Sequence, residues 1–447
     1  MLIFNLGFFD RLPFNIPLTV PEVYETESAV TLYQRYINTL KTDYTSATKI
    51  EFLYPDGSVA YSITEDVIQD GSTLNVSYQK IGSRRSATLV INNWKRTYEL
   101  HPDKLWFGQQ IKISMGVLLS DGTEYLLPQG IFYVSNPSEV YYPSERITTF
   151  SLVDKWAALD GTVFGYFPDI YKLTVGNNLY TAINQLLLID RGNGYPLDNI
   201  PPLLSKQILS KTYQIDSSTY NYIDCPYTAK IGGSYSDVLN EINTMLVSTM
   251  GYDAVGNLRV EPANADIEDN YRPVLWQFST EDRELLGIRM NSHPESLYNH
   301  VVITGGTLNG HVARGEAMDE DPRSPTSVLR IGKKTSPPEE QSKYYADAQC
   351  QELADYRLSQ YKKLSTEVTI ECSPLYHLQE NCLVTIWRDG VDDGYVPYLV
   401  SGWSLPIGQT GTMSITASKL SIPADNRYLA PTVIDFYSGE LYSGAMI

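Results

Sequence analysis

Apolar positions change their spacing between residues 28 and 63. Over residues 28–44 they recur every three or four positions, which predicts a helix with one buried stripe. From Thr48 they alternate with polar positions, which predicts β-strands. Between two such strands, Pro55-Asp56-Gly57-Ser58 has the composition of a hairpin turn. The stripe and the alternating positions are Val30, Tyr33, Ile37, Leu40 and Tyr44, then Ile50, Phe52, Tyr54, Val59, Tyr61 and Ile63.

Short alternating segments continue to about residue 155 and define a first β unit over residues 45–155. Asp121-Gly122 joins two of them as a second tight hairpin. Short strands at this spacing, with turn residues between them, are typical of an antiparallel barrel or sandwich. The strands are expected near 72–80, 85–93, 109–118, 124–134 and 145–153.

Helical periods then return, so residues 156–290 are expected to form a mixed α/β insert. Asn177 or Asn178 can cap a helix that runs to Ile189. Ser234 begins another helix, for which Gly251 is a suitable end. Residues 253–257 then form a turn into a strand.

A second β unit is expected over residues 291–421. Its first strands bracket a turn at Gly305-Gly306, and the Pro- and Glu-rich residues 337–340 begin a helix over 338–362. Four strands follow, near 366–372, 382–388, 396–403 and 412–419. Residues 1–44 are an N-terminal arm and helix, and residues 422–447 are a C-terminal arm. The fold class is therefore α+β and mainly β, with two β units flanking the insert.

The net charge of the chain limits its partners. With 34 Lys and Arg against 52 Asp and Glu, the net charge is −18. Phosphate backbones and anionic membrane surfaces repel such a chain, so we expect neither sequence-independent nucleic-acid binding nor a stable membrane association. Charged residues are only 19% and Tyr outnumbers Phe by 34 to 12. This composition suits either buried subunit contacts or Tyr-rich strands.

Motifs that carry chemistry are scarce in this chain. It has no Gly-x-Ser-x-Gly, no Walker loop and no His-Glu-x-x-His, so we expect no catalytic residue, cofactor or metal site. Three alternatives are a metal site at His293, His300 and His311, a cation loop at 316–321 or 389–394, and sugar-stacking pairs at Tyr141-Tyr142 and Tyr344-Tyr345. Each has a plainer interpretation: the histidines make ordinary hydrogen bonds, the acidic loops are solvated, and the tyrosines lie on strands or at subunit contacts.

Two features bear on where the protein is made. The four cysteines show no Cys-x-x-Cys pair and no regular spacing, so buried thiols in a reducing compartment are expected. The N-terminus has neither a basic leader nor a small-residue cleavage site, and no apolar run approaches the length of a membrane span. We expect a soluble protein made in a cytoplasm.

The order of elements resembles the tail hub (baseplate hub) proteins of tailed bacteriophages. The resemblance covers about residues 45–420, by pattern and order rather than by a catalytic signature. The segments that carry it are SLVDKWAALDGTVFG (151–165), SYSDVLNEINTMLVSTMGYDAVGNLRVEP (234–262), NHVVITGGTLNGHVARGEAMDEDPRSPTSV (299–328) with the helix after it, and the strands from VTIECSPLYHLQENCLVTIWRDG to WSLPIG.

The resemblance implies two tube-type antiparallel β-barrels in one chain. Three chains would then present six barrels to a six-fold tail tube and three-fold symmetry to the tip. It implies a homotrimer in the virion, with a tail tube or distal tail protein on one side and a tail-tip, spike or receptor-binding protein on the other. Viral DNA would pass through without specific binding. No lysozyme or peptidase domain is appended, so the resemblance implies a structural hub.

Two groups of residues are candidates for these roles. The N-terminal arm, residues 1–27, is too apolar to leave in water, and its three prolines oppose regular structure, so it is expected to dock on a neighbour through Phe4, Phe8, Phe9, Phe14 and Ile16. An acidic channel wall would repel DNA. Its candidates lie on hairpins of the β units: Asp56, Asp121, Asp389, Asp392 and Asp393.

Two other functions stay open at this point. A receptor- or carbohydrate-binding tip protein would expose several Tyr rings in one groove. A wall-degrading enzyme would hold paired carboxylates in a cleft. A hub would instead bury its Tyr residues in subunit contacts.

Overall fold

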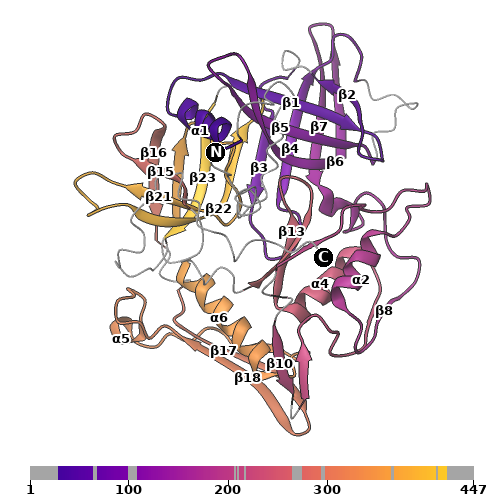
Figure 1. Cartoon of the computed structure of the whole chain (residues 1–447), viewed down its shortest axis with the longest axis vertical. Coiled ribbons are helices and arrows are strands. Elements are labelled where there is room, and N and C mark those ends of the chain that lie inside the picture. Colours follow the sequence, from indigo (N-terminus) through magenta and orange to yellow (C-terminus); the bar gives the residue numbers. More distant parts are fainter. Residues whose placement is uncertain are drawn as a thin grey trace, which may run out of the picture.

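The computed structural model describes residues 29–63, 68–98, 108–205, 208, 211–215, 218–263, 274–292, 297–363, 367–408 and 411–419. Two groups of strands lie side by side in the upper half of Figure 1, and two smaller modules with helices lie below them. The chain is mainly β with few helices, as the alternating pattern predicted. Among the described residues, no helix has the length and apolar character that crossing a bilayer requires.

One 13-stranded sheet, largely antiparallel, contains the strands of both β units, in the order β16-β20-β23-β22-β3-β4-β7-β6-β5-β1-β2, with β21 pairing β22 and β15. Its first half comprises β1 (Ser46–Leu53), β2 (Val59–Ile63), β3 (Thr73–Ser77), β4 (Arg85–Asn92), β5 (Gln110–Leu118), β6 (Glu124–Tyr142) and β7 (Glu145–Asp154). Its second half comprises β15 (Val274–Ser279), β16 (Leu285–Asn291), β20 (Glu367–Cys372), β21 (Leu383–Trp387), β22 (Val396–Pro406) and β23 (Met413–Lys419).

The two halves meet where β22 pairs antiparallel with β3, over five residue pairs from Gly402–Ser77 to Pro406–Thr73. Helix α1 (Ala29–Leu40) packs beside this join, and its buried residues belong to one hydrophobic cluster with side chains from both halves. The cluster includes Leu32 and Tyr36 of α1, Leu89 of β4 and Ile370 of β20. The two β units therefore share a core.

The insert forms its own hydrophobic cluster around two helices. Asn178 caps α2, and Ser234 caps α4 in a capping box with Asp237, as the sequence indicated for both N-termini. The 3-10 helix η4 leads into this module. The elements are η4 (Lys155–Ala158), β8 (Tyr171–Leu173), α2 (Leu179–Leu187), β9 (Leu203–Leu204), β10 (Thr212–Ile215), β11 (Ser218–Asn221), β12 (Ala229–Ile231), α4 (Tyr235–Leu246), β13 (Ser248–Tyr252) and β14 (Leu258–Pro262).

A third module packs a helix on a three-stranded sheet, at the lower left of Figure 1. The helix lies very close to the sheet at Gly315, because a Cβ added there would lie 2.2 Å from the carbonyl carbon of Cys350. Its elements are β17 (His300–Leu308), β18 (His311–Met318), the short α5 (Val328–Ile331), β19 (Glu339–Gln341) and α6 (Asp347–Lys363).

Three sequence-based boundaries are wrong. The helix expected over 338–362 begins at Asp347, because residues 339–341 instead pair in parallel with β17. The turn expected at Gly305-Gly306 lies at Asn309-Gly310, both with positive φ, and the two earlier glycines continue β17. The helix expected to end at Gly251 ends at Val247, whose φ is 46°, because residues 248–252 pair with β14.

The membership of the second β unit also differs from the expected ranges. β15 and most of β16 precede residue 291 yet pair with β21 and β20. Conversely, β17, β18, β19 and α6 lie outside the large sheet. The four cysteines are buried thiols, as expected.

Candidate functional site

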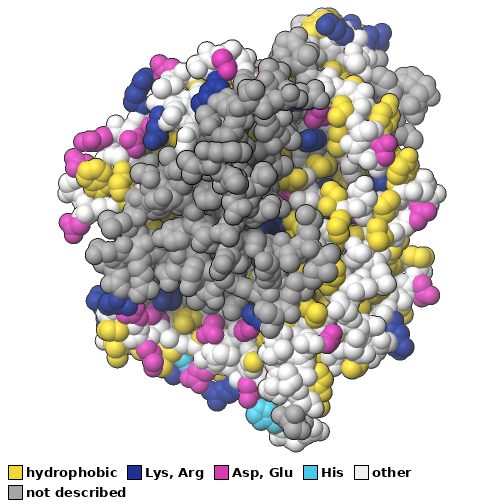
Figure 2. Space-filling view, viewed as in Figure 1, with side chains coloured by type: hydrophobic (Ala, Val, Ile, Leu, Met, Phe, Trp, Pro, Cys, Tyr) yellow, Lys and Arg dark blue, Asp and Glu magenta, His cyan; other side chains and the backbone are white. Residues whose placement is uncertain are grey.

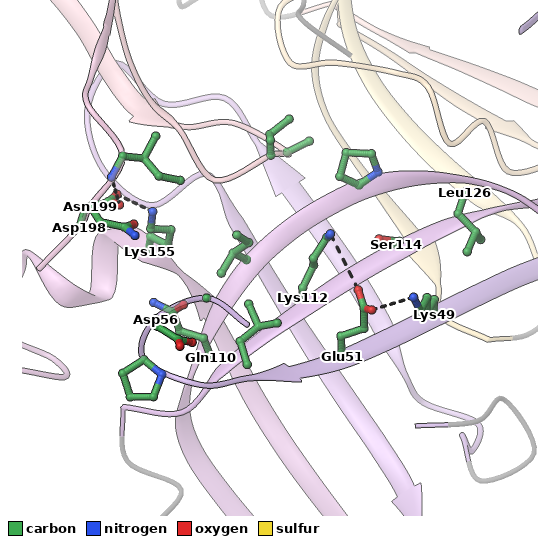
Figure 3. Close-up of a pocket in the computed structure, with 18 of the residues that line it drawn as sticks. Lys49, Glu51, Asp56, Gln110, Lys112, Ser114, Leu126, Lys155, Asp198 and Asn199 are labelled. Carbon is green, nitrogen blue, oxygen red and sulfur yellow. Dashed lines mark hydrogen bonds and ion pairs between the residues drawn. The ribbon is translucent and has the colours of Figure 1, made fainter. Parts of the chain in front are cut away.

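A groove of about 970 Å³ lies between the outer face of β1, β5 and β6 and the loops of the insert (Figure 3). Side chains at alternate positions of β1 and β5 form one wall, because successive residues of a strand point to opposite faces. Residues 191–200 and 254–255 of the insert form the other wall. The groove is therefore a product of how the insert sits on the first β unit.

A short ladder of charge runs along the strand wall. Glu51 lies opposite Lys112 in the β1–β5 register, and its carboxylate is 2.7 Å from Lys49 Nζ and 3.8 Å from Lys112 Nζ. The Glu51 side chain is 8% exposed, whereas the two lysines are 50% and 38% exposed. The wall is thus a half-exposed polar surface on which one carboxylate is shared by two lysines.

A buried ion pair closes the end of the groove against the insert. Lys155 Nζ lies 2.5 Å from Asp198 Oδ2 and donates a hydrogen bond to the Gly256 carbonyl over 2.9 Å. The Tyr252 hydroxyl donates to the same Asp198 oxygen over 3.0 Å. Burial lowers the pKa of the Lys155 ammonium, and the Asp198 carboxylate opposes that shift. These contacts fix η4, which directly follows β7, against the loops of the insert.

A second buried ion pair joins the two β units. Arg85 Nη2 on β4 lies 2.7 Å from Glu380 Oε1, with side chains 1% and 8% exposed. Arg85 also donates to the Gln129 carbonyl over 2.8 Å, and the Gln129 amide donates to the Tyr376 carbonyl over 2.8 Å. Nearly three hundred residues separate Arg85 from Glu380, so this contact sets how the units are placed.

A buried histidine completes the join. His377 Nε2 donates to the Leu275 carbonyl over 3.1 Å, since a carbonyl can only accept. His377 Nδ1 therefore accepts from the Tyr36 hydroxyl of α1 over 3.0 Å. Complete burial lowers the pKa of His377 to about 4, so the imidazole is neutral at pH 7.

The structure distributes the predicted channel acids over separate hairpins. Asp56 accepts from Ser58 within the β1–β2 turn, and Asp121 in the β5–β6 turn pairs with Arg35 of α1 at 2.7 Å. Asp392 pairs with Arg388 at 2.6 Å, while Asp389 and Asp393 are exposed beside it in the β21–β22 loop. Asp56 alone of the five lines the groove. The arm residues Phe4, Phe8, Phe9, Phe14 and Ile16 lie outside the described residues, as does the C-terminal arm.

Of the three histidines considered for a metal site, His293 lies outside the described residues, and His300 and His311 have ordinary hydrogen-bond partners, as does the acidic run. His300 contacts Glu316 over 2.7 Å, and His311 contacts Asp347 over 3.0 Å. Asp319 accepts from two hydroxyls and lies 3.2 Å from Lys362 Nζ, so it fixes its loop against α6. Within the described ranges, His, Cys, Asp and Glu form no group suited to a metal ion.

The residues that hold the units together were not identified from sequence. Arg85 stood in the sequence only as part of a short basic pair, and Lys155 as part of a resembling segment. The spatial pairings with Glu380 and Asp198 carry no sequence signal. The one local signal is the position of Arg85 in β4 (RSATLVIN), where it shares the buried face of the strand with Ala87, Leu89 and Ile91.

No protein-family model and no curated protein sequence matches this chain. Two solved structures share its fold over most of its length. The tail protein from Neisseria meningitidis has a TM-score of 0.53 at 13% identity, covering 84% of this chain and 97% of its own. The prophage MuSo2 43 kDa tail protein from Shewanella oneidensis has a TM-score of 0.52 at 12% identity, covering 84% and 98%. The chain thus has the fold of these two tail proteins, and the resemblance seen in its sequence is confirmed at the level of fold.

Proposed function

We propose that this chain is a structural protein of a bacteriophage tail, the trimeric hub that joins the six-fold tail tube to the three-fold tip. The observation that carries the proposal is the pair of β units placed side by side in one chain through the β22–β3 pairing. The fold shared with two tail proteins, one of them from a prophage, supports it. In this proposal each β unit is a tube-type barrel, so three chains supply six.

The copy number tests this proposal directly. Mass measurement of the ring isolated from tails, together with an image of the assembled particle, should give three copies at the end of the tube. Six copies, or a chain that is a monomer in the virion, would overturn the proposal.

The partners of the hub follow from its position. One face meets the tail tube or distal tail protein, the other meets a tip, spike or receptor-binding protein, and viral DNA passes between. The five channel acids would contribute to a wall that repels phosphate. A map of the surface potential of the assembled ring tests this, because a lumen dominated by Lys and Arg would contradict a conduit.

The N-terminal arm is part of the proposal as an anchor on a neighbouring subunit or protein. Its five apolar residues would each contribute roughly 1.5–3 kcal/mol on burial. Deletion of residues 1–27 should abolish incorporation into tails while the β units stay folded. Normal incorporation of the deletion variant would exclude the anchor.

A tip protein that binds receptor or carbohydrate is the second candidate, favoured by the exposure of Tyr141 and Tyr142 at 53% and 60%. The other pair weakens it, because Tyr344 is 2% exposed. Binding of host wall polysaccharide by the purified chain, lost on replacing both exposed tyrosines with Ala, would favour this candidate over the hub.

A further inference from the structure

Near the end of the β6–β7 hairpin, two exposed aromatic rings flank one partly buried guanidinium. Arg146 lies 4.6 Å from the centroid of the Tyr141 ring and 5.2 Å from that of Trp94. Tyr141 and Trp94 are 53% and 47% exposed. Arg146 Nε is buried, yet it has no hydrogen-bond partner in the described part of the chain. We call Trp94, Tyr141 and Arg146 the aromatic tip.

The loop between β21 and β22, residues 388–394, has the opposite character. Val391 is 67% exposed at its end, with the exposed carboxylates of Asp389 and Asp393 close by in sequence. Arg388 holds the loop in shape, because its Nε and Nη2 contact the two oxygens of Asp392 at 2.7 and 2.6 Å. The Asp389 N–H donates to Thr280 Oγ1, which fixes the loop to the end of β15. We call residues 388–394 the acidic loop.

The aromatic tip and the acidic loop complement each other and belong to different halves of the large sheet. Figure 1 places β6 and β7 on the right and β21 on the left. The positive charge of Arg146 is complementary to the carboxylates of Asp389 and Asp393. The exposed aromatic rings are complementary in apolar character to Val391. Contact between two different patches of successive copies is head-to-tail, and it closes into a ring when the rotation between copies is suitable.

We propose that the aromatic tip of one copy binds the acidic loop of the next copy around the ring. Arg146 pairs with Asp389 or Asp393, while Val391 packs on the exposed rings of Trp94 and Tyr141. Trp, Tyr and Arg are the residue types enriched where binding energy concentrates. Both patches are held by contacts within their own chain, so association orders few side chains.

This contact rests on the proposed ring of three copies and refines one part of it. Asp389 and Asp393 would lie between subunits, which removes them from the acids of the channel wall. Asp392 would act within its own chain, through Arg388.

Charge reversal in the full-length chain tests the contact. We expect Arg146→Glu, or Asp389→Lys with Asp393→Lys, to raise the protein concentration at half-assembly by roughly tenfold or more, because like charges then face each other. The triple variant that combines all three changes should restore assembly. The measurement is mass by light scattering or native mass spectrometry over a concentration series, with circular dichroism to verify that each variant is folded.

Matched controls are Lys41→Glu and Asp70→Lys, which make similar charge changes at exposed positions that belong to neither patch. Wild-type trimers that persist in both reversed variants would overturn the contact and leave the trimeric hub intact. A wild-type chain that stays monomeric at every concentration would overturn both. Assembly that fails without rescue in the triple variant, while all variants are folded, would also contradict the pairing. Sugar binding at the tip that survives Arg146→Glu, with trimers unchanged, would assign the tip to a glycan instead.

Discussion

The join between the two β units and the strand wall of the groove both contain paired charges, but in different surroundings. At the join, Arg85 and Glu380 are almost wholly buried, and His377 is neutral between two fixed hydrogen bonds. On the wall, Glu51 pairs with two lysines that are each more than a third exposed. Water screens the second set and cannot reach the first. Paired charges therefore determine how the two β units are placed at the join, whereas on the wall they contribute little to stability.

Removing one member of the buried pair should have the largest effect on stability. Glu380→Ala leaves the Arg85 guanidinium without its partner in an apolar surrounding, so we expect a loss of about 3–5 kcal/mol in the free energy of unfolding. Denaturant titration followed by fluorescence measures it. A double variant, Arg85→Met with Glu380→Leu, should recover much of the loss because no charge is left buried. A loss below about 1 kcal/mol in Glu380→Ala would show that solvent reaches the pair.

Acid should weaken the join through His377. The folded-state pKa is about 4 and the unfolded value is 6.5, so the neutral ring contributes stability above pH 6.5 that is lost as the pH falls to about 4. The difference corresponds to about 3 kcal/mol. Thermal unfolding from pH 7.5 to 4 measures the slope. His377→Gln, which can still bond both neighbours, should be less stable at pH 7 but should lack this part of the pH dependence.

The backbone contact at the join should tolerate no added methyl group. A Cβ at Gly402 would lie 2.4 Å from the Val76 carbonyl oxygen of β3, so Gly402→Ala should cost about 1–3 kcal/mol through displaced strands. Gly394 is the matched control, because nothing lies within 4 Å of its Cβ position and its φ is not in the left-handed region. We expect Gly394→Ala to change stability by less than about 0.5 kcal/mol. Equal effects at both glycines would contradict the close approach of β22 and β3.

The strand wall should give the smallest effect. Glu51→Ala removes a carboxylate whose two partners can turn to water, so we expect a change of about 0–1 kcal/mol that decreases further in high salt. Chemical denaturation at two salt concentrations measures it. A cost as large as that of Glu380→Ala would remove the distinction between wall and join.

The sequence predicted the strands well and their grouping less well. Most predicted strands lie within a residue or two of the observed ones, because alternation and turns such as Asp121-Gly122 are local signals. Grouping depends on long-range pairing. Nothing local distinguishes β15, which joins the large sheet, from β17, which does not.

Two local signals were outweighed by tertiary contacts. Pro337 to Glu340 have the composition of a first helical turn, but a strand pairing with β17 stabilises residues 339–341 in an extended form. Gly251 could have ended α4, but Val247 does so with a left-handed backbone, since the following residues are needed for the buried β13–β14 hairpin. The buried pairs at Arg85 and Lys155 could not be predicted, because each depends on a partner positioned by the whole fold.

The five-pair ladder between β3 and β22 has a mechanical consequence for a protein that would carry load between tube and tip. Antiparallel hydrogen bonds lie across the strands, so a force that slides one β unit along the other strains all of them together. A force that peels the units apart breaks them one after another, beginning most easily at Pro406, which donates no hydrogen bond. The joint is therefore stiff against sliding and compliant against opening, and its hinge line is the strand pair itself.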